Sequence, residues 1–348
     1  MRNGARTADA ADRRSTLLPP GPGRYPPRLA MADETARLAS RAREVLGPLS
    51  GEHPFTPRFL AVRGHSMHHV DEGPGDAAGE RPGVVLCVHG NPTWSFYWRR
   101  IVEALSPEAR VVAPDHLGMG LSSRVPGGVR LAEHVDGLVT LIDQLELDDI
   151  TLVCHDWGGA IGFGAVLARR ERFRSLVVTN TAAFPSSRIP RRIAACRIPL
   201  LGRVGVQGGN AFARAALHMT TARPLAKSAR DGLIAPYDGW ANREQVWRFV
   251  KDIPMRPAHP SWAKLCEISD GLESLRGLPM EIVWGMQDWC FSPEFKSTWE
   301  QRFPEANVTE LADAGHYVNE DAPEAVIAAI RRVRAVDGHA PAPEGARA

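Results

Sequence analysis

Short apolar runs that alternate with helical segments constrain the fold of this chain more than any other feature. The runs are mostly β-branched and lie at residues 83–90, 110–115, 150–156, 174–180, 280–286 and 307–313. Because they are apolar on both sides, they have the pattern of parallel strands that are covered on both faces. Segments that begin near residue 130 and at Pro323 place apolar residues at helical spacing. The alternation predicts an α/β fold, a mostly parallel sheet with helices on both faces.

A hairpin and a helical insertion modify this plan. Residues 58–64 and 66–73 predict a hairpin that turns at Gly64 and forms an antiparallel edge, which brings the sheet to eight strands. Residues 183–276 contain no strong strand, but several helix-like pieces broken by proline and glycine. We therefore expect a helical cap after the sixth strand, over the strand ends where open sheets bind ligands.

The domain boundaries follow from these segments. The predicted divisions are an arm and short helix (1–52), a core (53–182 and 277–336), a cap (183–276) and a tail (337–348). Residues 1–30 are rich in proline and arginine and predict a disordered arm, and residues 32–47 predict a surface helix. Met31 is an alternative start of translation.

The amino-acid composition limits the partners and the cellular compartment that we expect for this protein. Of the 348 residues, 44% are hydrophobic, enough for a sizeable core, and the net charge of +2 gives no argument for nucleic acid or an anionic membrane as partner. Cys87 and Cys154 lie inside apolar runs, which favours buried thiols in a reducing compartment. The sequence shows neither a secretory signal nor an apolar run long enough to span a bilayer. We expect a cytoplasmic protein with no membrane span.

A sharp turn between a predicted strand and a predicted helix carries the first candidate catalytic residue. In VCHDWGG, the spacing of Cys154, Asp156 and Gly158 matches a nucleophile elbow, whose pattern is small, any, nucleophile, any, glycine. Small residues are needed because the strand and helix backbones crowd together at the turn. An isolated aspartate at this position more often caps the helix, so the interpretation depends on its partners.

Those partners are an acid and then a histidine, downstream in the chain. Asp288 follows the run 280–286 and His316 follows the run 307–313, so both lie at carboxyl ends of predicted strands. The stretch after the preceding strand offers no carboxylate. Taken alone, His316 is better explained as a loop cap, but the order of the three residues predicts a catalytic triad with Asp156.

The same logic locates the donors that would stabilise developing negative charge. The backbone N–H of Trp157 follows the nucleophile, and Asn91 lies in the loop HGNPTW after the first central strand. The Asn91 amide and the Trp157 indole can also donate into the cavity, and both are neutral. This pair suits a departing anion in an apolar pocket and does not favour a substrate with a permanent carboxylate.

An aspartate in the nucleophile position selects the electrophile. A carboxylate needs no proton removed before it attacks, and it can displace a leaving group from saturated carbon to give an alkyl ester of the enzyme. His316, oriented by Asp288, would then activate water against that ester. The chemistry therefore differs from that of a serine esterase.

Four motifs resemble the haloalkane dehalogenase branch of the α/β-hydrolase fold. They are HGNPTWSFYWR (89–99), HDWGG (155–159), WGMQD (284–288) and DAGHYVNED (313–321). The resemblance runs from about residue 55 to 335. It implies Asp156 as nucleophile, His316 as base and Asp288 as acid, with Asn91 and Trp157 as the halide-binding pair.

Further motifs resemble the β-lactone decarboxylases of bacterial long-chain olefin biosynthesis, which share this catalytic set. They are NTAAF (180–184), GGNAFARAALHM (208–219), APYDGWANR (235–243), FVKDIP (249–254) and WGMQDWCF (284–291). This resemblance implies conversion of a cis-3,4-dialkyl β-lactone to a cis-alkene and carbon dioxide, with haloalkane hydrolysis as the alternative. It leaves open whether Asp156 attacks the lactone carbonyl or the ring carbon. Several of the motifs lie in the cap, where we expect Phe184, Phe212 and Trp240 to line the substrate pocket.

Other enzyme classes fit less well. Epoxide hydrolases also use HDWG but need two cap tyrosines, and the predicted cap holds only Tyr237. Fluoroacetate dehalogenases are expected to have arginine after the nucleophile, where this chain has Trp157. A binding protein that kept the elbow without turnover would be expected to lose a triad residue, and none is lost.

The expected partners are a small hydrophobic, long-chain substrate and an enzyme complex of olefin biosynthesis, with no nucleic acid. Neither a cofactor nor a metal is expected, because His68 and His69 are neighbours on a strand and point to opposite faces. Trp247 and Trp262 are expected in the cap core. The arginines of residues 188–203 form a basic run, interpreted first as a solvated face and second as a docking surface for an acidic partner.

Overall fold

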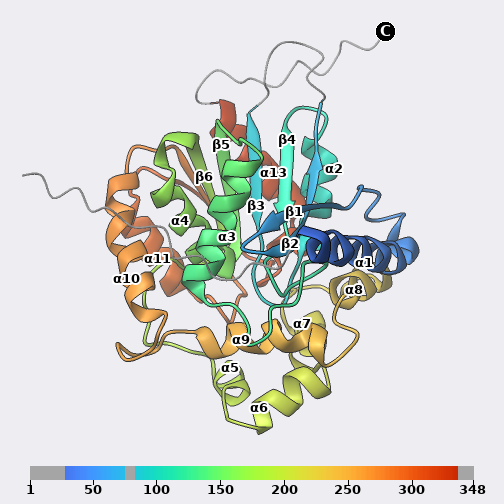
Figure 1. The fold of residues 1–348 in the computed structure, drawn as a ribbon. Helices are drawn as coiled ribbons and strands as arrows, with labels where there is room; N and C mark the ends of the chain where they lie inside the picture. The colour runs from blue at the N-terminus through green and yellow to red at the C-terminus, as the bar shows by residue number, and fades with distance from the viewer. Residues whose placement is uncertain (1–27, 75–82, 336–348) are drawn as a thin grey trace, which may run out of the picture.

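An eight-stranded sheet organises the computed structural model, which describes residues 28–74 and 83–335 (Figure 1). The strands are β1 (Arg58–Val62), β2 (His65–Glu72), β3 (Val84–Val88), β4 (Arg110–Pro114), β5 (Ile150–Asp156), β6 (Phe173–Thr181), β7 (Met280–Gly285) and β8 (Asn307–Leu311). Their order across the sheet is β1-β2-β4-β3-β5-β6-β7-β8. The pairs β1/β2 and β2/β4 are antiparallel and the other pairs are parallel. The predicted fold class, including the antiparallel edge, is confirmed.

Helices cover both faces of the sheet, which explains why its central strands are apolar on both sides (Figure 1). On one face lie α3 (Leu131–Gln144) and α4 (Trp157–Ala168), and on the other lie α2 (Arg99–Leu105) and α13 (Pro323–Ala335). Every residue of β5 is buried. Strands β3, β5 and β7 thus contribute their full side-chain area to the core, at about 25 cal/mol per Å² of apolar surface removed from water.

The remaining helices lie at the sheet edges and beyond the strand ends. They are α1 (Arg28–Leu46), α5 (Arg191–Cys196), α6 (Leu201–Arg203), α7 (Ala211–Met219), α8 (Lys227–Ile234), α9 (Glu244–Asp252), α10 (Trp262–Gly271), α11 (Pro293–Arg302) and α12 (Val318–Asp321). Between β6 and β7 the chain forms α5 to α10, as the predicted insertion after the sixth strand requires. Helices α5, α6, α7 and α9 lie together beyond the carboxyl ends of the parallel strands (Figure 1).

The structure bears on two of the predicted boundaries. Helix α10 lies within the predicted cap but packs against α4 of the core, where Ile268 approaches Gly164 and Leu167 approaches Gly271. Helix α1 begins at Arg28, so the end of the predicted disordered arm is helical. The rest of that arm and the predicted tail lie outside the described residues. Among the described residues, no helix is both long and apolar enough to cross a membrane.

The hairpin turn between β1 and β2 follows from local backbone preference. Arg63 has a φ of 52° and Gly64 a φ of 77°. Two consecutive residues with positive φ form the type of turn whose twist matches a two-residue hairpin. Gly64 therefore occupies the turn where the sequence predicted it.

A buried arginine ties helix α12, which follows the loop after β8, to the core. The Arg99 guanidinium donates to both carboxylate oxygens of Glu320, at 2.5 and 3.0 Å, and its Nε donates to Glu52 at 3.0 Å. Arg99 and the Glu320 side chain are almost fully buried, and the guanidinium also lies 4.2 Å from the Phe96 ring centroid. Removing one partner of such a pair leaves the other charge buried without compensation.

We expect Arg99→Met to lower the free energy of unfolding by about 3 kcal/mol, because it leaves the Glu320 carboxylate buried without its charged partner. The measurement is urea unfolding followed by circular dichroism. As a control, Arg331→Met removes an arginine paired with Glu108 at the surface and is expected to cost less than about 1 kcal/mol. Equal losses in the two variants would show that the buried pair has no special role.

Candidate active site

Asp156 occupies a strained turn at the end of β5 and the start of α4. Its φ is 52° and its ψ is −125°, a conformation that non-glycine residues rarely adopt. The neighbouring backbone is too close for larger residues: a Cβ on Gly158 would lie 2.0 Å from the carbonyl oxygen of Val88, and one on Gly90 would lie 2.1 Å from Oδ1 of Asp156. The small residues of the motif therefore allow the chain to present this carboxylate above the sheet.

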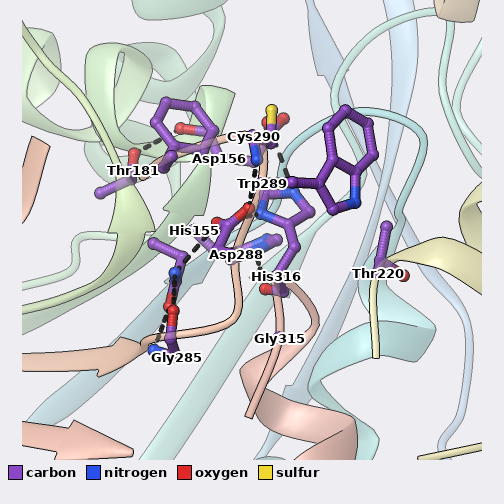
Figure 2. Close-up of polar contacts among 12 residues, drawn as sticks. His155, Asp156, Thr181, Thr220, Gly285, Asp288, Trp289, Cys290, Gly315 and His316 are labelled. Carbon is purple, nitrogen blue, oxygen red and sulfur yellow. Dashed lines mark hydrogen bonds and ion pairs between the residues drawn. The ribbon is translucent and has the colours of Figure 1, made fainter. Parts of the chain in front are cut away.

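Backbone amides hold the Asp156 carboxylate in place. The N–H of Asn91 donates to Oδ1 at 2.6 Å, and the backbone N–H of Trp157 also donates to the carboxylate. The Thr181 hydroxyl donates to the main-chain oxygen of Asp156 (Figure 2). The two N–H groups expected to stabilise a developing oxyanion thus bind the expected nucleophile itself.

The structure brings the three residues of the predicted triad together (Figure 2). Nε2 of His316 lies 3.7 Å from Oδ2 of Asp156, and Nδ1 of His316 lies 2.8 Å from Oδ2 of Asp288. All three side chains are buried, and they come from the end of β5 and from the loops after β7 and β8. The imidazole is therefore oriented by one carboxylate and faces the other.

Asn180, at the end of β6, positions Asp288. Its Nδ2 donates to Oδ2 of Asp288 at 2.9 Å and to the carbonyl of Gly285 at 3.1 Å, and its Oδ1 accepts from the N–H of Gly285 at 2.8 Å. The N–H of Cys290 donates to Oδ1 of Asp288 at 2.6 Å. Sequence reasoning did not assign Asn180 a role: an amide near the end of an apolar strand is a signal of a polar contact, but it does not identify Asp288 as the partner.

Burial and the neighbouring charges move the pKa values of both reacting groups. Burial raises the pKa of Asp156 above the usual value for aspartate, and the charge of His316 and the N–H groups of Asn91 and Trp157 offset this only in part. Burial lowers the pKa of His316, but the carboxylates of Asp288 and Asp156 outweigh it, so that this pKa lies above the ordinary value for histidine. The raised pKa of His316 favours the imidazolium, and the positive charge of that imidazolium in turn favours the ionised form of Asp156.

A cavity of about 570 Å³ lies between the core and the cap, with Asp156 and His316 in its wall. This volume is in the range of small-molecule sites. Most of the wall is apolar; its members include Phe184, Phe212, Ile193, Val206, Leu265 and Phe291. The cavity therefore suits a hydrophobic ligand.

Of the three predicted pocket residues, two line the cavity and one lies outside it. Phe184 and Phe212 line the cavity, as expected. Trp240 does not: it lies on the outside of the cap, where the Arg203 guanidinium is 5.6 Å from its ring centroid. The prediction for Trp240 was wrong because this residue lies in the turn between α8 and α9, where no helical periodicity shows which side chains point inward. The lining residue Trp289 was missed; its indole donates to the Met219 carbonyl at 2.5 Å.

The side chains of Asn91 and Trp157 both line the cavity. The Asn91 amide donates one hydrogen bond, to the Val246 carbonyl at 3.1 Å, which leaves its second N–H for a ligand. The Trp157 ring packs 5.2 Å from that of Phe249. These two neutral donors border the reactive end of an apolar chamber.

No cluster of potential metal ligands occurs in residues 28–74 and 83–335. His68, one of the two neighbouring histidines considered from the sequence, is 2.8 Å from the Asp115 carboxylate through Nδ1. That contact explains its burial without a metal.

The chain is similar to proteins of known class. The family described as alpha/beta hydrolase fold matches residues 83–323. Two proteins named cis-3-alkyl-4-alkyloxetan-2-one decarboxylase, from Shewanella oneidensis and Xanthomonas campestris, are each 40% identical over 80% of this chain and cover 88% and 96% of their own lengths. Haloalkane dehalogenase 2 of Mycobacterium tuberculosis is 33% identical over 80% of this chain and 94% of its own. The crystal structure of a haloalkane dehalogenase from Bradyrhizobium elkani has a TM-score of 0.73 at 26% identity, with coverage of 81% and 99%.

We expect Asp288→Asn to lower the pKa of His316, because the Asp288 carboxylate favours the imidazolium. The measurement is an NMR titration of the His316 ring protons, assigned by their loss in His316→Gln. Asp313→Asn, which alters an exposed carboxylate paired with Arg223, serves as the control and should leave the His316 pKa unchanged. An unchanged pKa in Asp288→Asn would contradict the proposed ion pair.

Proposed function

The chain belongs to the α/β-hydrolase fold family, together with the cis-3-alkyl-4-alkyloxetan-2-one decarboxylases, and we propose that it converts cis-3,4-dialkyl β-lactones to cis-alkenes and carbon dioxide. The observation that carries this proposal is a buried carboxylate, Asp156, at the wall of an apolar cavity whose nearby donors, Asn91 and Trp157, are neutral. The relatives with this name support the choice of substrate, since they share 40% identity over most of the chain.

The first step is displacement at the lactone ring carbon that bears the ring oxygen. An oxygen of Asp156 bonds to that carbon while the carbon–oxygen bond of the ring breaks, and the electron pair leaves on the ring oxygen. The products of this step are an alkyl ester of Asp156 and a carboxylate within the same substrate. The Asn91 amide and the Trp157 indole are placed to donate to that carboxylate, because both line the cavity next to Asp156.

Attack at the ring carbon is favoured over attack at the lactone carbonyl by the hydrogen bonds of Asp156. Carbonyl attack needs donors for the new oxyanion. The backbone N–H groups of Asn91 and Trp157, which would supply them, already donate to the Asp156 carboxylate. Attack at saturated carbon leaves the two hydrogen bonds to Asp156 in place. The new negative charge forms on the substrate carboxylate, to which the side chains of Asn91 and Trp157 can donate.

The second step releases both products without water. The bond between the substrate carboxylate carbon and the former ring carbon breaks, and its electron pair forms the double bond. The ester carbon–oxygen bond breaks at the same time and returns its pair to Asp156. Inversion in the first step followed by anti elimination in the second preserves the cis arrangement of the two alkyl groups.

His316 and Asp288 assist the departure of Asp156 as a carboxylate. An imidazolium 3.7 Å from Oδ2 stabilises the returning charge, and Asp288 favours that protonation state. With an alkyl halide, the same histidine in its neutral form would activate water against the ester, which is the chemistry of the alternative function, haloalkane dehalogenation. The dehalogenase relatives make this the second candidate.

The proposal includes a cytoplasmic location and a place in long-chain olefin biosynthesis, alongside other enzymes of that pathway. A reducing compartment is supported by Cys87 and Cys154, which are free and buried, and whose thiol pKa values are raised by that burial. The apolar cavity supports a substrate with hydrocarbon chains.

The test offers the purified protein a cis-dialkyl β-lactone labelled with ¹⁸O at the ring oxygen and, separately, a 1-bromoalkane. We expect cis-alkene and labelled carbon dioxide from the lactone and no bromide from the bromoalkane. Asp156→Asn should reduce turnover at least about 10⁴-fold, since it removes the nucleophile. Asp313→Asn, an exposed carboxylate, is the matched control and should retain full turnover.

Each contrary result has a distinct meaning. Bromide without alkene would reverse the order of the two candidate functions. Alkene with the label in water would replace ring-carbon attack by carbonyl attack. Full turnover by Asp156→Asn would exclude the covalent mechanism in either form.

A further inference from the structure

The tip of the cap exposes an unusual concentration of apolar side chains. Of the six large hydrophobic side chains that are exposed among the described residues, four lie within residues 198–204. Their exposed fractions are 47% for Ile198, 80% for Leu200, 68% for Leu201 and 57% for Val204. Scattered apolar residues on a surface need no explanation, but a contiguous exposed group marks an interaction site.

Trp240 extends this group, which explains its place outside the cavity. A Cβ built on Gly208 would lie 3.5 Å from the Trp240 ring and 3.8 Å from the Val204 side chain, so the two are neighbours. Trp240 is 46% exposed. Tryptophan is enriched where a protein meets the boundary between a membrane and water. We call residues 198–204 together with Trp240 the apolar tip.

The apolar tip lies at the end of the cap that is farthest from the sheet. Helix α6, which contains Leu201, projects beyond α5, α7 and α9 (Figure 1). A flat surface could therefore approach it without contact with the core.

The cap segment that forms most of the apolar tip carries only positive charge, and the acidic residues nearest Trp240 in sequence, Asp238 and Glu244, are paired with Arg41 and Arg248. The chain has no aspartate or glutamate between Glu171 and Asp231. Arg191 and Arg192 are exposed beside the tip, and neither has an acidic partner in the described part of the chain. By contrast, Arg188 pairs with Glu294 at 2.7 Å, so that its charge is compensated. An apolar group with uncompensated arginines is complementary to an apolar layer covered by anionic groups.

The cavity reaches the surface at this same place. Arg192, Ala195 and Leu201 are exposed and also line the cavity that holds Asp156. A ligand could therefore pass between the surface that contacts the tip and the reactive carboxylate. A substrate with two alkyl chains dissolves in a bilayer far better than in water, since each buried CH₂ favours transfer by about 0.8 kcal/mol.

We infer that the apolar tip docks on the surface of a bilayer that carries anionic lipid headgroups. Leu200, Leu201 and Val204 enter the boundary between headgroups and acyl chains, Trp240 lies at the level of the headgroups, and Arg191 and Arg192 pair with lipid phosphates. This inference goes beyond the proposed function, and binding to the bilayer does not depend on that activity.

The experiment measures co-sedimentation of the full-length protein with vesicles, without substrate. Binding is expected to vesicles of phosphatidylglycerol and phosphatidylcholine at 50 mM salt, to weaken at 500 mM salt, and to be absent with phosphatidylcholine alone. Leu200→Ser with Val204→Ser should weaken binding at least about tenfold. Arg191→Gln should weaken it about fivefold.

Matched controls use residues of the same kind far from the tip. Val308→Ser changes an apolar side chain that is 38% exposed on β8, and Arg43→Gln changes an exposed arginine on α1. Both should bind vesicles like the unchanged protein. None of the tip substitutions touches a residue of the cavity wall, so the alkene assay with dispersed substrate reports on the proposed function separately.

Three results would overturn the inference. The first is no binding of the unchanged protein to anionic vesicles at low salt. The second is an equal loss in the control variants, which would indicate general adhesion. The third is a dimer in solution that the tip substitutions dissociate while vesicles are ignored, which would assign the tip to a second copy of the chain.

Discussion

The rest of the site depends on one constraint, a mostly buried carboxylate held at a strained turn. Asp156 combines a positive φ with burial, and burial raises the pKa of its carboxyl group. Both features cost folding free energy, because strained backbone and a desolvated charge are each unfavourable. The two backbone N–H groups and the imidazole reduce this cost but do not remove it. A carboxylate in this state is more reactive toward carbon than one in bulk water, since burial has already removed much of its hydration shell.

The residues around Asp156 support its buried carboxylate and its strained backbone. Gly90 and Gly158 leave room for the turn, while Asn180 and the Cys290 amide hold the acid that orients His316. The buried Arg99–Glu320 pair anchors the loop that carries His316 to the core. The cap then closes the reactive side of Asp156 with mostly apolar residues, and the side-chain donors beside the carboxylate are the neutral Asn91 and Trp157 and the imidazole of His316. The fold thus separates a polar support below the sheet edge from an apolar chamber above it.

Backbone periodicity and chain order made the sheet and the triad predictable from the sequence. Parallel strands have apolar residues on both sides, and their carboxyl ends meet at one edge, so the positions of Asp156, Asp288 and His316 along the chain were enough to predict that they lie together. Roles that depend on a particular side-chain contact were not visible. Asn180 positions Asp288 across two neighbouring strands, and nothing in the local sequence identifies that partner. Trp240 lies in a turn between two cap helices, where no periodicity reveals an inner face, which is why it was placed in the pocket.

The most direct test of the account is to identify the residue that bonds to the substrate. In His316→Ala the departure of Asp156 is slowed, because the nearby imidazolium is gone, and the ester should accumulate with a cis-dialkyl β-lactone. Mass spectrometry of the protein and of its proteolytic peptides would then show an added mass equal to the intact lactone, on the peptide that contains Asp156 and on that side chain. An adduct on any other side chain, or a β-lactone turned over by Asp156→Asn, would contradict the central claim.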